Sequence, residues 1–218
     1  EGIIIPIMLD TKGPEIRTGL FENNGIVLSK GDKIRIVKED VLGNKERFTL
    51  KCKEVFNDVK VGNMVLIDDG KMRLQVESIE EDGFSCVSIT NGPIKNTKGV
   101  NIPDVKLTMP FLSEKDIADI TFGVEEDIDL ISLSFVRRKE DIDDVRNLVT
   151  KLGKPNITIM SKIENKEAIN NLEDIINASD AIMVARGDLA VETEPEMVPI
   201  FQKKIIKMCN LLGKPVVT

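Results

Sequence analysis

The second half of the chain shows a regular alternation of apolar runs and helical periodicity. From about residue 110, apolar runs at 128–135, 157–163 and 181–185 are each followed by a stretch whose apolar residues recur at helical spacing. Ser113, with Asp116 three residues later, is a typical N-cap for the first helix. Strand and helix alternate about every 25 to 35 residues, which is the βα unit of a parallel sheet or barrel. We expect the helices around residues 117–124, 142–152, 168–176 and 198–212, and a further strand at 216–218.

Residues 20–100 follow a different rhythm. Turn signals rich in Gly, Asn and Asp separate short β-type runs, and no window has helical periodicity. This pattern predicts a small all-β barrel or sandwich. The runs that we expect to be strands are 33–37, 64–67, 72–76 and 84–89.

The run 3–9 predicts one more buried strand before this β region begins. We therefore expect an α/β protein in which an all-β module is inserted between two βα-type segments. Pro14 and Pro110 lie at the two crossings, where the fixed φ of proline suits a hinge but equally suits the simple end of a strand. The expected domains are 1–13 and 110–218 for the α/β part and 14–109 for the insertion.

Composition narrows the classes of function. The chain has 30 basic and 37 acidic residues, a net charge of −7, which argues against a nucleic-acid partner. No apolar run approaches the roughly 20 residues needed to span a membrane, and no signal-peptide pattern is present. Histidine is absent, which removes Ser-His and Cys-His nucleophiles and histidine-based zinc sites. The cysteines are far apart and odd in number, which favours a reducing cytoplasm over a disulfide framework; they are Cys52, Cys86 and Cys209.

Polar side chains stand at the carboxyl end of each expected strand of the α/β segments. In a (β/α) barrel this end is where the active site is assembled. A strand that merely runs into solvent gives one such placement, whereas here the pattern repeats in every unit. The residues concerned are Asp10, Ser134, Arg137, Lys162, Glu164, Arg186 and Asp188.

Glu164 and Asp188 form a candidate site for a hard divalent cation, because two carboxylates from neighbouring strands leave room for water and substrate oxygens. Lys162 and Glu164 are two residues apart on a strand and project to the same face. A lysine beside a metal-bound carboxylate makes a cationic pocket for a phosphoryl group or an enolate oxygen. A buried ion pair is the alternative. Backbone N–H groups around Gly187, at the start of a helix, are able to hold an anion.

Longer motifs around these residues resemble signature segments of the pyruvate kinase family. They occur in the family's order and cover the chain from end to end. The segments are 9–19 (LDTKGPEIRTG), 98–103 (KGVNIP), 113–116 (SEKD), 134–137 (SFVR), 161–165 (SKIEN) and 183–189 (MVARGDL). The resemblance implies a partial (β/α)8 barrel of the TIM type, from its third strand to the start of its seventh, with the family's small all-β barrel domain inserted in it.

The same resemblance implies transfer of a phosphoryl group from phosphoenolpyruvate to ADP, followed by protonation of the enolate to pyruvate. It implies Mg²⁺ (or Mn²⁺) and K⁺ as cofactors, and a cytoplasmic homotetramer without nucleic-acid or membrane partners. Phosphoryl transfer needs positioning and charge neutralisation more than covalent chemistry. The implied roles are Mg²⁺ ligation by Glu164 and Asp188, K⁺ binding by Asp10 and Thr11, catalysis by Lys162 and Arg17, nucleotide binding by Arg17 and Lys98, and substrate binding by Lys162, Ser134, Gly187 and Asp188.

The sequence departs from the family pattern in two respects. Ala190 stands where a glycine is usual, which puts a close backbone approach at this position in question. Residues 192–195 also differ from the usual family sequence. The family's Asn-x-Ser motif with its neighbouring Arg, its catalytic Thr and its C-terminal domain have no counterpart within residues 1–218. We therefore expect a central fragment that lacks a complete active site.

Two other interpretations use the same residues. A metal-dependent aldolase acting on phosphoenolpyruvate or pyruvate also has a Glu/Asp pair on adjacent strands, but it needs no phosphate clamp such as Arg17 and Lys98. A non-catalytic binding module, in which only the β domain matters, is the other. Its net acidity and lack of aromatic rows speak against single-stranded nucleic acid as a ligand. A nucleotide titration with and without Mg²⁺ separates these cases.

Overall fold

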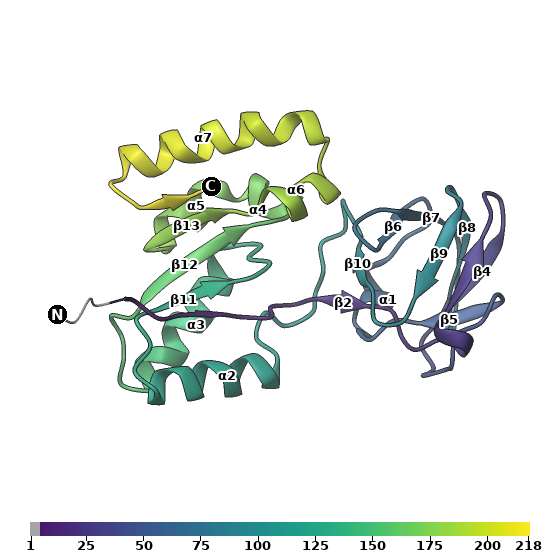
Figure 1. The fold of residues 1–218 in the computed structure, drawn as a ribbon, viewed down its shortest axis with the longest axis horizontal. Helices are drawn as coiled ribbons and strands as arrows, with labels where there is room; N and C mark the ends of the chain where they lie inside the picture. The colour runs from purple at the N-terminus through teal and green to yellow at the C-terminus, as the bar shows by residue number, and fades with distance from the viewer. Residues whose placement is uncertain (1–4) are drawn as a thin grey trace. The chain divides into compact units, whose positions relative to one another are not determined.

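The computed structural model describes residues 5–218, which form two compact units. The α/β unit comprises the chain up to Pro14 together with Pro110–Thr218, and the β unit comprises Glu15–Met109. Each unit has a hydrophobic core of its own. Figure 1 shows a sheet flanked by helices in the first unit and a nearly all-β arrangement in the second.

A five-stranded parallel sheet forms the centre of the α/β unit (Figure 1). Neighbours in the sheet pair in parallel throughout, and helices connect successive strands from β11 onward. The strands, in spatial order, are β1 (Met8–Asp10), β11 (Leu130–Leu133), β12 (Thr158–Ile163), β13 (Ala181–Val184) and β14 (Val216–Val217). The helices are α2 (Glu114–Glu125), α3 (Lys139–Lys151), α4 (Lys166–Asn170), α5 (Leu172–Ala178), α6 (Arg186–Glu192), the 3-10 turn η2 (Pro195–Met197) and α7 (Val198–Leu211).

Local sequence signals explain where these elements begin. Ser113 caps α2 with a complete capping box: its hydroxyl accepts from the Asp116 N–H, and the Asp116 carboxylate accepts from the Ser113 N–H. This confirms the N-cap predicted from the sequence. One face of the sheet carries Ile131, Ile159 and Ile182, which are completely buried in the core. The opposite face becomes polar toward the carboxyl ends of the strands.

Two expectations for the α/β unit are wrong in detail. The run 3–9 was expected to be a buried strand, but the strand is β1, and Ile5, Ile7 and Met8 are exposed. Residues 3 and 4 of that run lie outside the described residues. The reason is that β1 has a neighbour on one side only, β11, so its other edge is uncovered. The helix expected over 168–176 is divided at Asn171 into α4 and α5.

The β unit is built on a seven-stranded sheet and a separate two-stranded ribbon (Figure 1). Pairing in the sheet is antiparallel except between β4 and β5. The sheet strands, in spatial order, are β2 (Ile16–Arg17), β10 (Gly99–Asn101), β6 (Met64–Ile67), β7 (Met72–Glu80), β8 (Gly83–Ser88), β4 (Lys33–Val37) and β5 (Arg47–Thr49). The ribbon pairs β3 (Gly25–Leu28) with β9 (Gly92–Lys95), and η1 (Glu22–Asn24) and α1 (Val55–Asp58) complete the unit.

Hydrogen bonds join the two end strands of this sheet, so the sheet closes into a small barrel. Thr18 and Leu50 form an antiparallel bridge. Beside it the Lys51 N–H donates to Arg17 O (2.8 Å) and the Gly19 N–H donates to Thr49 O (2.8 Å). Of the two architectures that the turn spacing predicts, barrel and sandwich, the barrel is therefore the one that forms.

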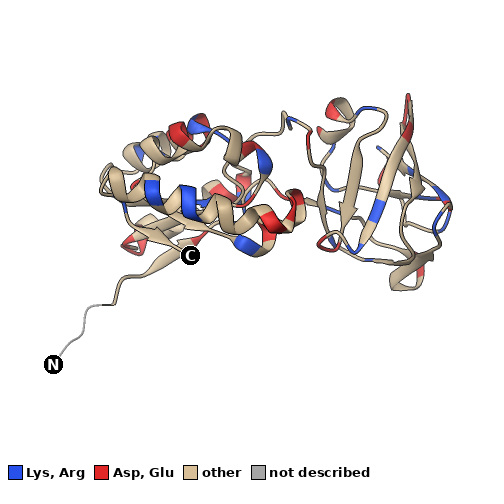
Figure 2. Ribbon diagram, turned by 90° about the horizontal axis from the view of Figure 1, so that it is seen from above, with Lys and Arg blue, Asp and Glu red and all other residues tan. Residues whose placement is uncertain are grey.

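Most of the β unit's strands were predictable. The runs expected at 33–37 and 64–67 coincide with β4 and β6, and β7 extends beyond its expected run to Glu80. The short helix α1 was not expected; it buries Val55 and Phe56 in the core. Basic and acidic positions are interspersed in both units (Figure 2). Among residues 5–218, no helix is long and apolar enough to cross a bilayer.

Candidate active site at the carboxyl ends of the parallel strands

The carboxyl ends of β1 and β11 are joined by a short network of hydrogen bonds. The Thr11 N–H donates to Ser132 O (2.9 Å), the Ser134 N–H donates to Thr11 Oγ1 (3.2 Å), and the Ser134 hydroxyl donates to Thr11 O (2.5 Å). Ser134 Oγ also lies 3.4 Å from Asp10 Oδ1. The structure thus brings Asp10, Thr11 and Ser134 together.

Lys162, on β12, connects this network to Glu164. Its Nζ lies 3.0 Å from Asp10 Oδ1 and 3.4 Å from Glu164 Oε1, and only 13% of its side chain is exposed. Burial by itself lowers the pKa of the Lys162 ammonium, but the Glu164 and Asp10 carboxylates outweigh burial and raise that pKa. Lys162 therefore remains charged between two carboxylates.

Glu164 follows β12 directly and is buried, with 3% of the residue exposed. The Phe135 N–H donates to its Oε2 (2.5 Å). Burial raises the pKa of Glu164; Lys162 and the Phe135 N–H oppose that rise, and the charge of Asp188 adds to it. A buried carboxylate with a second carboxylate nearby is a place where additional positive charge is favourable.

Gly187 and Asp188 lie in the first turn of α6, just after β13. Both residues are exposed. The charge of Asp188 helps to raise the pKa of Glu164, so the two expected Mg²⁺ ligands lie within electrostatic range of each other.

Arg137 does not follow the strand-end pattern. It is buried and pairs with Asp141, with 3.1 Å between its guanidinium and Asp141 Oδ1. The Arg137 N–H also donates to Asp141 Oδ2 (2.9 Å), and Asp141 lies in the first turn of α3. These contacts stabilise the start of α3. They account for the charged side chain of Arg137 through its contact with a helix rather than through a role in the site.

The two cations expected to bind nucleotide belong to the β unit: Arg17 lies on β2, and Lys98 immediately precedes the neighbouring strand β10. Arg17 pairs with Glu15 through Nε (2.8 Å) and Nη2 (2.5 Å), and its Nη1 donates to Thr97 O (2.8 Å). Lys98 Nζ lies 2.9 Å from Asp68 Oδ1, and its hydrogen bond lowers the pKa of Asp68. Gly99, next to Lys98, pairs with Arg17 in the sheet. Both cations are therefore held by carboxylates of their own unit.

Comparison with known proteins shows what family has this arrangement. The family model described as the pyruvate kinase barrel domain matches residues 1–218. The chain belongs to the pyruvate kinase family. This confirms the resemblance noted in the motifs and, with it, the expected partial (β/α)8 barrel carrying a small inserted β domain.

Pyruvate kinases from bacteria and a protozoan are close relatives. The chain is 47% identical to the pyruvate kinase of Staphylococcus haemolyticus over 100% of its own length and 37% of that protein. It is 46% identical to the pyruvate kinase of Clostridium acetobutylicum, over 98% of the chain and 46% of that protein. The crystal structure of a pyruvate kinase from Cryptosporidium parvum superposes with a TM-score of 0.90 at 39% identity, covering 97% of the chain and 44% of that structure. The chain thus spans less than half the length of these pyruvate kinases.

Three residues that shape the site were not expected to do so. Phe135 has a positive φ of 56°, which is rare for a bulky residue and leaves no mark in the sequence. Gly13 has a φ of 71°, and Asp116 accepts a hydrogen bond from the Gly13 N–H in addition to capping α2. At Gly13 the residue type itself, a glycine before Pro14, was a signal for an unusual backbone conformation. The Asp116 contact is tertiary and has no such signal.

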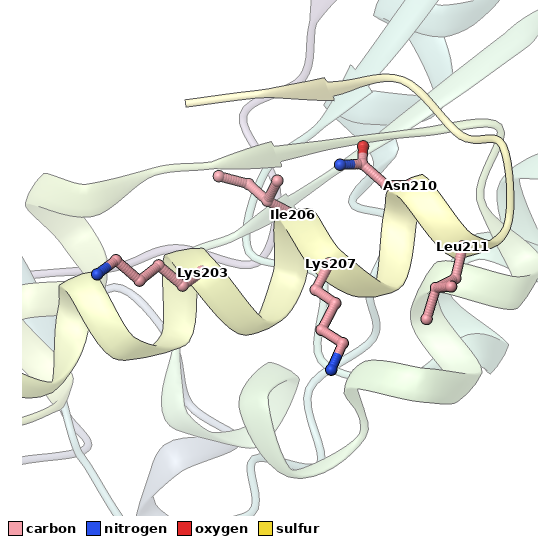
Figure 3. A pocket seen from close by; sticks show the side chains of 5 residues that line it. All are labelled: Lys203, Ile206, Lys207, Asn210 and Leu211. Carbon is pink, nitrogen blue, oxygen red and sulfur yellow. The ribbon is translucent and has the colours of Figure 1, made fainter.

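Two surface hollows lie away from the candidate site residues. One, of about 410 Å³, runs along α7, and Figure 3 shows the side chains that line it projecting from that helix. They are Lys203, Ile206, Lys207, Asn210 and Leu211. A larger hollow of about 830 Å³ in the β unit is lined by η1, β3 and the segment 44–46, together with Pro93 and Lys95. Neither hollow is lined by a candidate site residue.

Proposed function

We propose that this chain carries the metal- and phosphoryl-binding part of a pyruvate kinase active site, which transfers the phosphoryl group of phosphoenolpyruvate to ADP. The observation that carries the proposal is the Lys162 ammonium held between the Asp10 and Glu164 carboxylates, 3.0 Å and 3.4 Å away. A fixed cation at this place stabilises negative charge that develops on a phosphoryl group and on an enolate oxygen. Family membership supports these two substrates.

Glu164 and Asp188 fit a Mg²⁺ or Mn²⁺ ion. Both supply hard oxygen ligands, and burial, with the charge of Asp188, raises the pKa of Glu164, so a bound cation would favour its ionised form. Among residues 5–218 no group of three or more Cys, Asp or Glu gathers as a metal site, and the proposed site uses two carboxylates. Such a pair suits Mg²⁺, which keeps water and substrate oxygens in its remaining positions. The ion would neutralise charge on the phosphoryl oxygens when bound.

Asp10 and Thr11 are proposed to bind K⁺. The Asp10 carboxylate and the Thr11 carbonyl oxygen both lie within 3.4 Å of Ser134 Oγ, so three hard oxygen atoms lie close together here. Ser132, which pairs with Asp10 across the sheet, is fully buried, and its hydroxyl has no hydrogen-bond partner within residues 5–218. A buried oxygen without a partner beside a carboxylate supports a cation or an ordered water there.

The remaining roles follow the charges of the site. Ser134 and the backbone N–H groups of Gly187 and Asp188 are proposed to receive the substrate, the latter two its carboxylate. Arg17 and Lys98 are proposed to bind the nucleotide phosphates, which would replace the Glu15 and Asp68 carboxylates that hold them. Arg17 would then assist catalysis by stabilising charge on the transferred group.

The same proposal places the whole protein in the cytoplasm as a homotetramer without nucleic-acid or membrane partners. The cysteines support a reducing compartment, because all of them are free and buried: Cys52, Cys86 and Cys209.

The metal site is tested by Mn²⁺ titration of the chain, followed by electron paramagnetic resonance. Glu164→Gln and Asp188→Asn should each weaken Mn²⁺ binding about tenfold or more, because an amide does not match the charge of a carboxylate at a cation. Glu173→Gln and Asp174→Asn make the same chemical changes on exposed residues of α5 and serve as controls. Unchanged binding in both site variants would remove these residues from the metal site.

The phosphoryl chemistry is tested in a full-length protein that carries the same residues. Lys162→Met should abolish formation of ATP from phosphoenolpyruvate and ADP in a lactate dehydrogenase-coupled assay, since it removes the cation at the reacting group. A nucleotide titration with and without Mg²⁺ distinguishes this function from an aldolase. An aldolase would bind no ADP, and a Mg²⁺-independent affinity would indicate a simple binding module.

A further inference from the structure

A buried contact ties the loop after β1 to the start of α2. Asp116 is 1% exposed, and its Oδ1 accepts from the Gly13 N–H at 3.2 Å. Its Oδ2 accepts from the Ser113 N–H (3.1 Å) and the Ser113 hydroxyl (2.5 Å). Three donors thus converge on one carboxylate. Of these three donors the capping box of α2 uses only the Ser113 N–H, so the bond to Gly13 needs an explanation of its own.

Gly13 is packed against the peptide group that joins Ser134 to Phe135. A Cβ added to Gly13 would lie 2.4 Å from Ser134 O and 3.0 Å from Ser134 C. The φ of Gly13 is also positive, 71°, a conformation that glycine adopts without strain. The backbone of Gly13 therefore packs against the Ser134–Phe135 peptide and limits its movement in that direction.

The same peptide group orients Glu164. Its carbonyl, Ser134 O, faces Gly13, while its N–H, from Phe135, donates to Glu164 Oε2 at 2.5 Å. Phe135 is held at a φ of 56°, a strained conformation for a bulky residue that persists only where the surroundings enforce it. Gly13 is one of those surroundings.

We propose that Asp116 is a positioning residue for Glu164, acting through Gly13 and the Ser134–Phe135 peptide. Asp116 fixes the backbone of Gly13, Gly13 fixes the peptide, and the peptide N–H fixes Oε2 of Glu164. The start of α2 is thereby coupled to a side chain that it does not touch. That Glu164 binds a metal ion rests on the function proposed above; the positioning itself does not.

Three variants separate positioning from helix capping. Asp116→Asn keeps the shape of the side chain but turns one acceptor oxygen into a donor, so it is unable to accept from Gly13 and Ser113 together. Ser113→Ala removes the cap hydroxyl and leaves the Asp116 to Gly13 bond in place, which makes it the matched control. Gly13→Ala leaves the cap intact and displaces Ser134 O. It therefore tests the chain of contacts from Asp116 through Gly13 and the Ser134–Phe135 peptide to Glu164, called the relay below, even where Asp116→Asn unfolds α2.

The first measurement is amide hydrogen exchange of Phe135 in the 218-residue chain by NMR, relative to amides of α3 as an internal reference for global stability. Asp116→Asn and Gly13→Ala should accelerate exchange of the Phe135 N–H about tenfold or more, because its acceptor is no longer aligned. Ser113→Ala should leave it within about twofold of the unmodified chain once global stability is corrected. Equal acceleration in Ser113→Ala and Asp116→Asn, or none in Gly13→Ala, would overturn the proposal.

The second measurement is Mn²⁺ binding by electron paramagnetic resonance on the same variants. Asp116→Asn and Gly13→Ala should weaken binding about tenfold, and Ser113→Ala should not. If the unmodified chain binds no Mn²⁺, the metal assignment fails while the exchange data still decide the relay. Mn²⁺ binding that is unchanged in Gly13→Ala, with Phe135 exchange accelerated, would overturn the link from the relay to the metal site.

Discussion

The two units of this chain differ in whether their main β-sheet is closed. The seven-stranded sheet of the β unit is closed by hydrogen bonds between its end strands near Thr18 and Leu50, so that sheet has no free pair of edges. The sheet of the α/β unit ends at β1 on one side and β14 on the other, and no bridge joins the two among the described strands. Exposed apolar side chains occur on the segments at those two ends. They are Ile5 and Ile7 before β1, Met8 on β1, Ile117 and Phe122 on α2, Ile200 and Leu211 on α7, Leu212 just after α7, and Val217 on β14.

The difference shows that closure and chemistry are supplied by different parts of the molecule. Closing a sheet removes the unpaired N–H and C=O groups that make edge strands unstable and prone to aggregation. The candidate metal ligands nevertheless lie in the open unit, at the carboxyl ends of β12 and β13. The proposed function therefore depends on the unit that is less able to stabilise itself.

The largest effect that we expect is on turnover. The isolated 218-residue chain should give no measurable pyruvate kinase activity in a coupled assay, because an open parallel sheet does not hold ligands to the tolerance that phosphoryl transfer needs. Such a loss amounts to several orders of magnitude in rate. A full-length pyruvate kinase relative is the positive control. Turnover within about tenfold of the control would mean that the open unit is catalytically sufficient.

The next effect concerns the order of unfolding. In urea the α/β unit should unfold first and the β unit last, in two transitions. Phe48 is fully buried in the β unit, so Phe48→Ala should lower only the second transition, by about 3 to 5 kcal/mol in the free energy of unfolding. Phe122→Ala removes an aromatic ring that is 63% exposed and should change stability by less than about 0.5 kcal/mol. A single transition, or equal losses in the two variants, would contradict the contrast between the units.

A smaller effect is expected at Lys214, which supports the open unit from within. Its Nζ donates to the carbonyl oxygens of Ile176 (2.7 Å), Asn177 (2.7 Å) and Ser179 (2.6 Å) at the end of α5. Lys214→Met should destabilise the α/β unit by about 1 to 3 kcal/mol, because it leaves these carbonyls without a charged donor. Lys207→Met, on the exposed side of α7, is the control. Circular dichroism during urea unfolding would measure both, and equal stability of the two variants would refute this role.

The smallest effect is a pH dependence in the β unit. The Lys98 hydrogen bond lowers the pKa of Asp68 relative to its unfolded value. A lowered carboxyl pKa stabilises the folded state above the unfolded pKa, and this stability is lost as the pH falls through the folded pKa. Asp68→Asn should therefore reduce the acid sensitivity of the β unit by less than about 1 kcal/mol, since the pair is partly exposed. Parallel pH profiles for Asp68→Asn and the unmodified chain between pH 6 and about 2 would disprove the contribution.

The sequence was informative wherever a single element decides the outcome. The capping box at Ser113, the strands at 33–37 and 64–67, and the polar residues that end β11 and β12 all depend on local spacing. Periodicity and turn chemistry act within a few residues, and this is why the α/β and all-β parts were distinguishable without a structure.

The features that the sequence did not indicate all depend on distant neighbours. The run 3–9 is apolar enough for a buried strand, and only its edge position leaves Ile5 and Ile7 exposed. Asn171 divides one expected helix, and Phe135 has a positive φ that its residue type disfavours. Asp116 reaches Gly13 across more than a hundred residues of chain. None of these features changes the spacing of apolar and polar residues along the sequence, so periodicity does not predict them.

The pairing of β2 with β10 has a consequence for how this architecture is acquired and altered. The Thr18 N–H donates to Lys98 O (2.9 Å), and the Lys98 N–H donates to Thr18 Oγ1 (2.9 Å), so the incoming and outgoing strands of the β unit lie side by side. Because its two ends are adjacent, such a segment is able to be gained by a single insertion. It is likewise able to be removed by a single deletion that leaves a short connector. Exchange of 19–97 for the corresponding segment of another family member should therefore preserve the α/β fold while changing the residues presented beside Arg17 and Lys98.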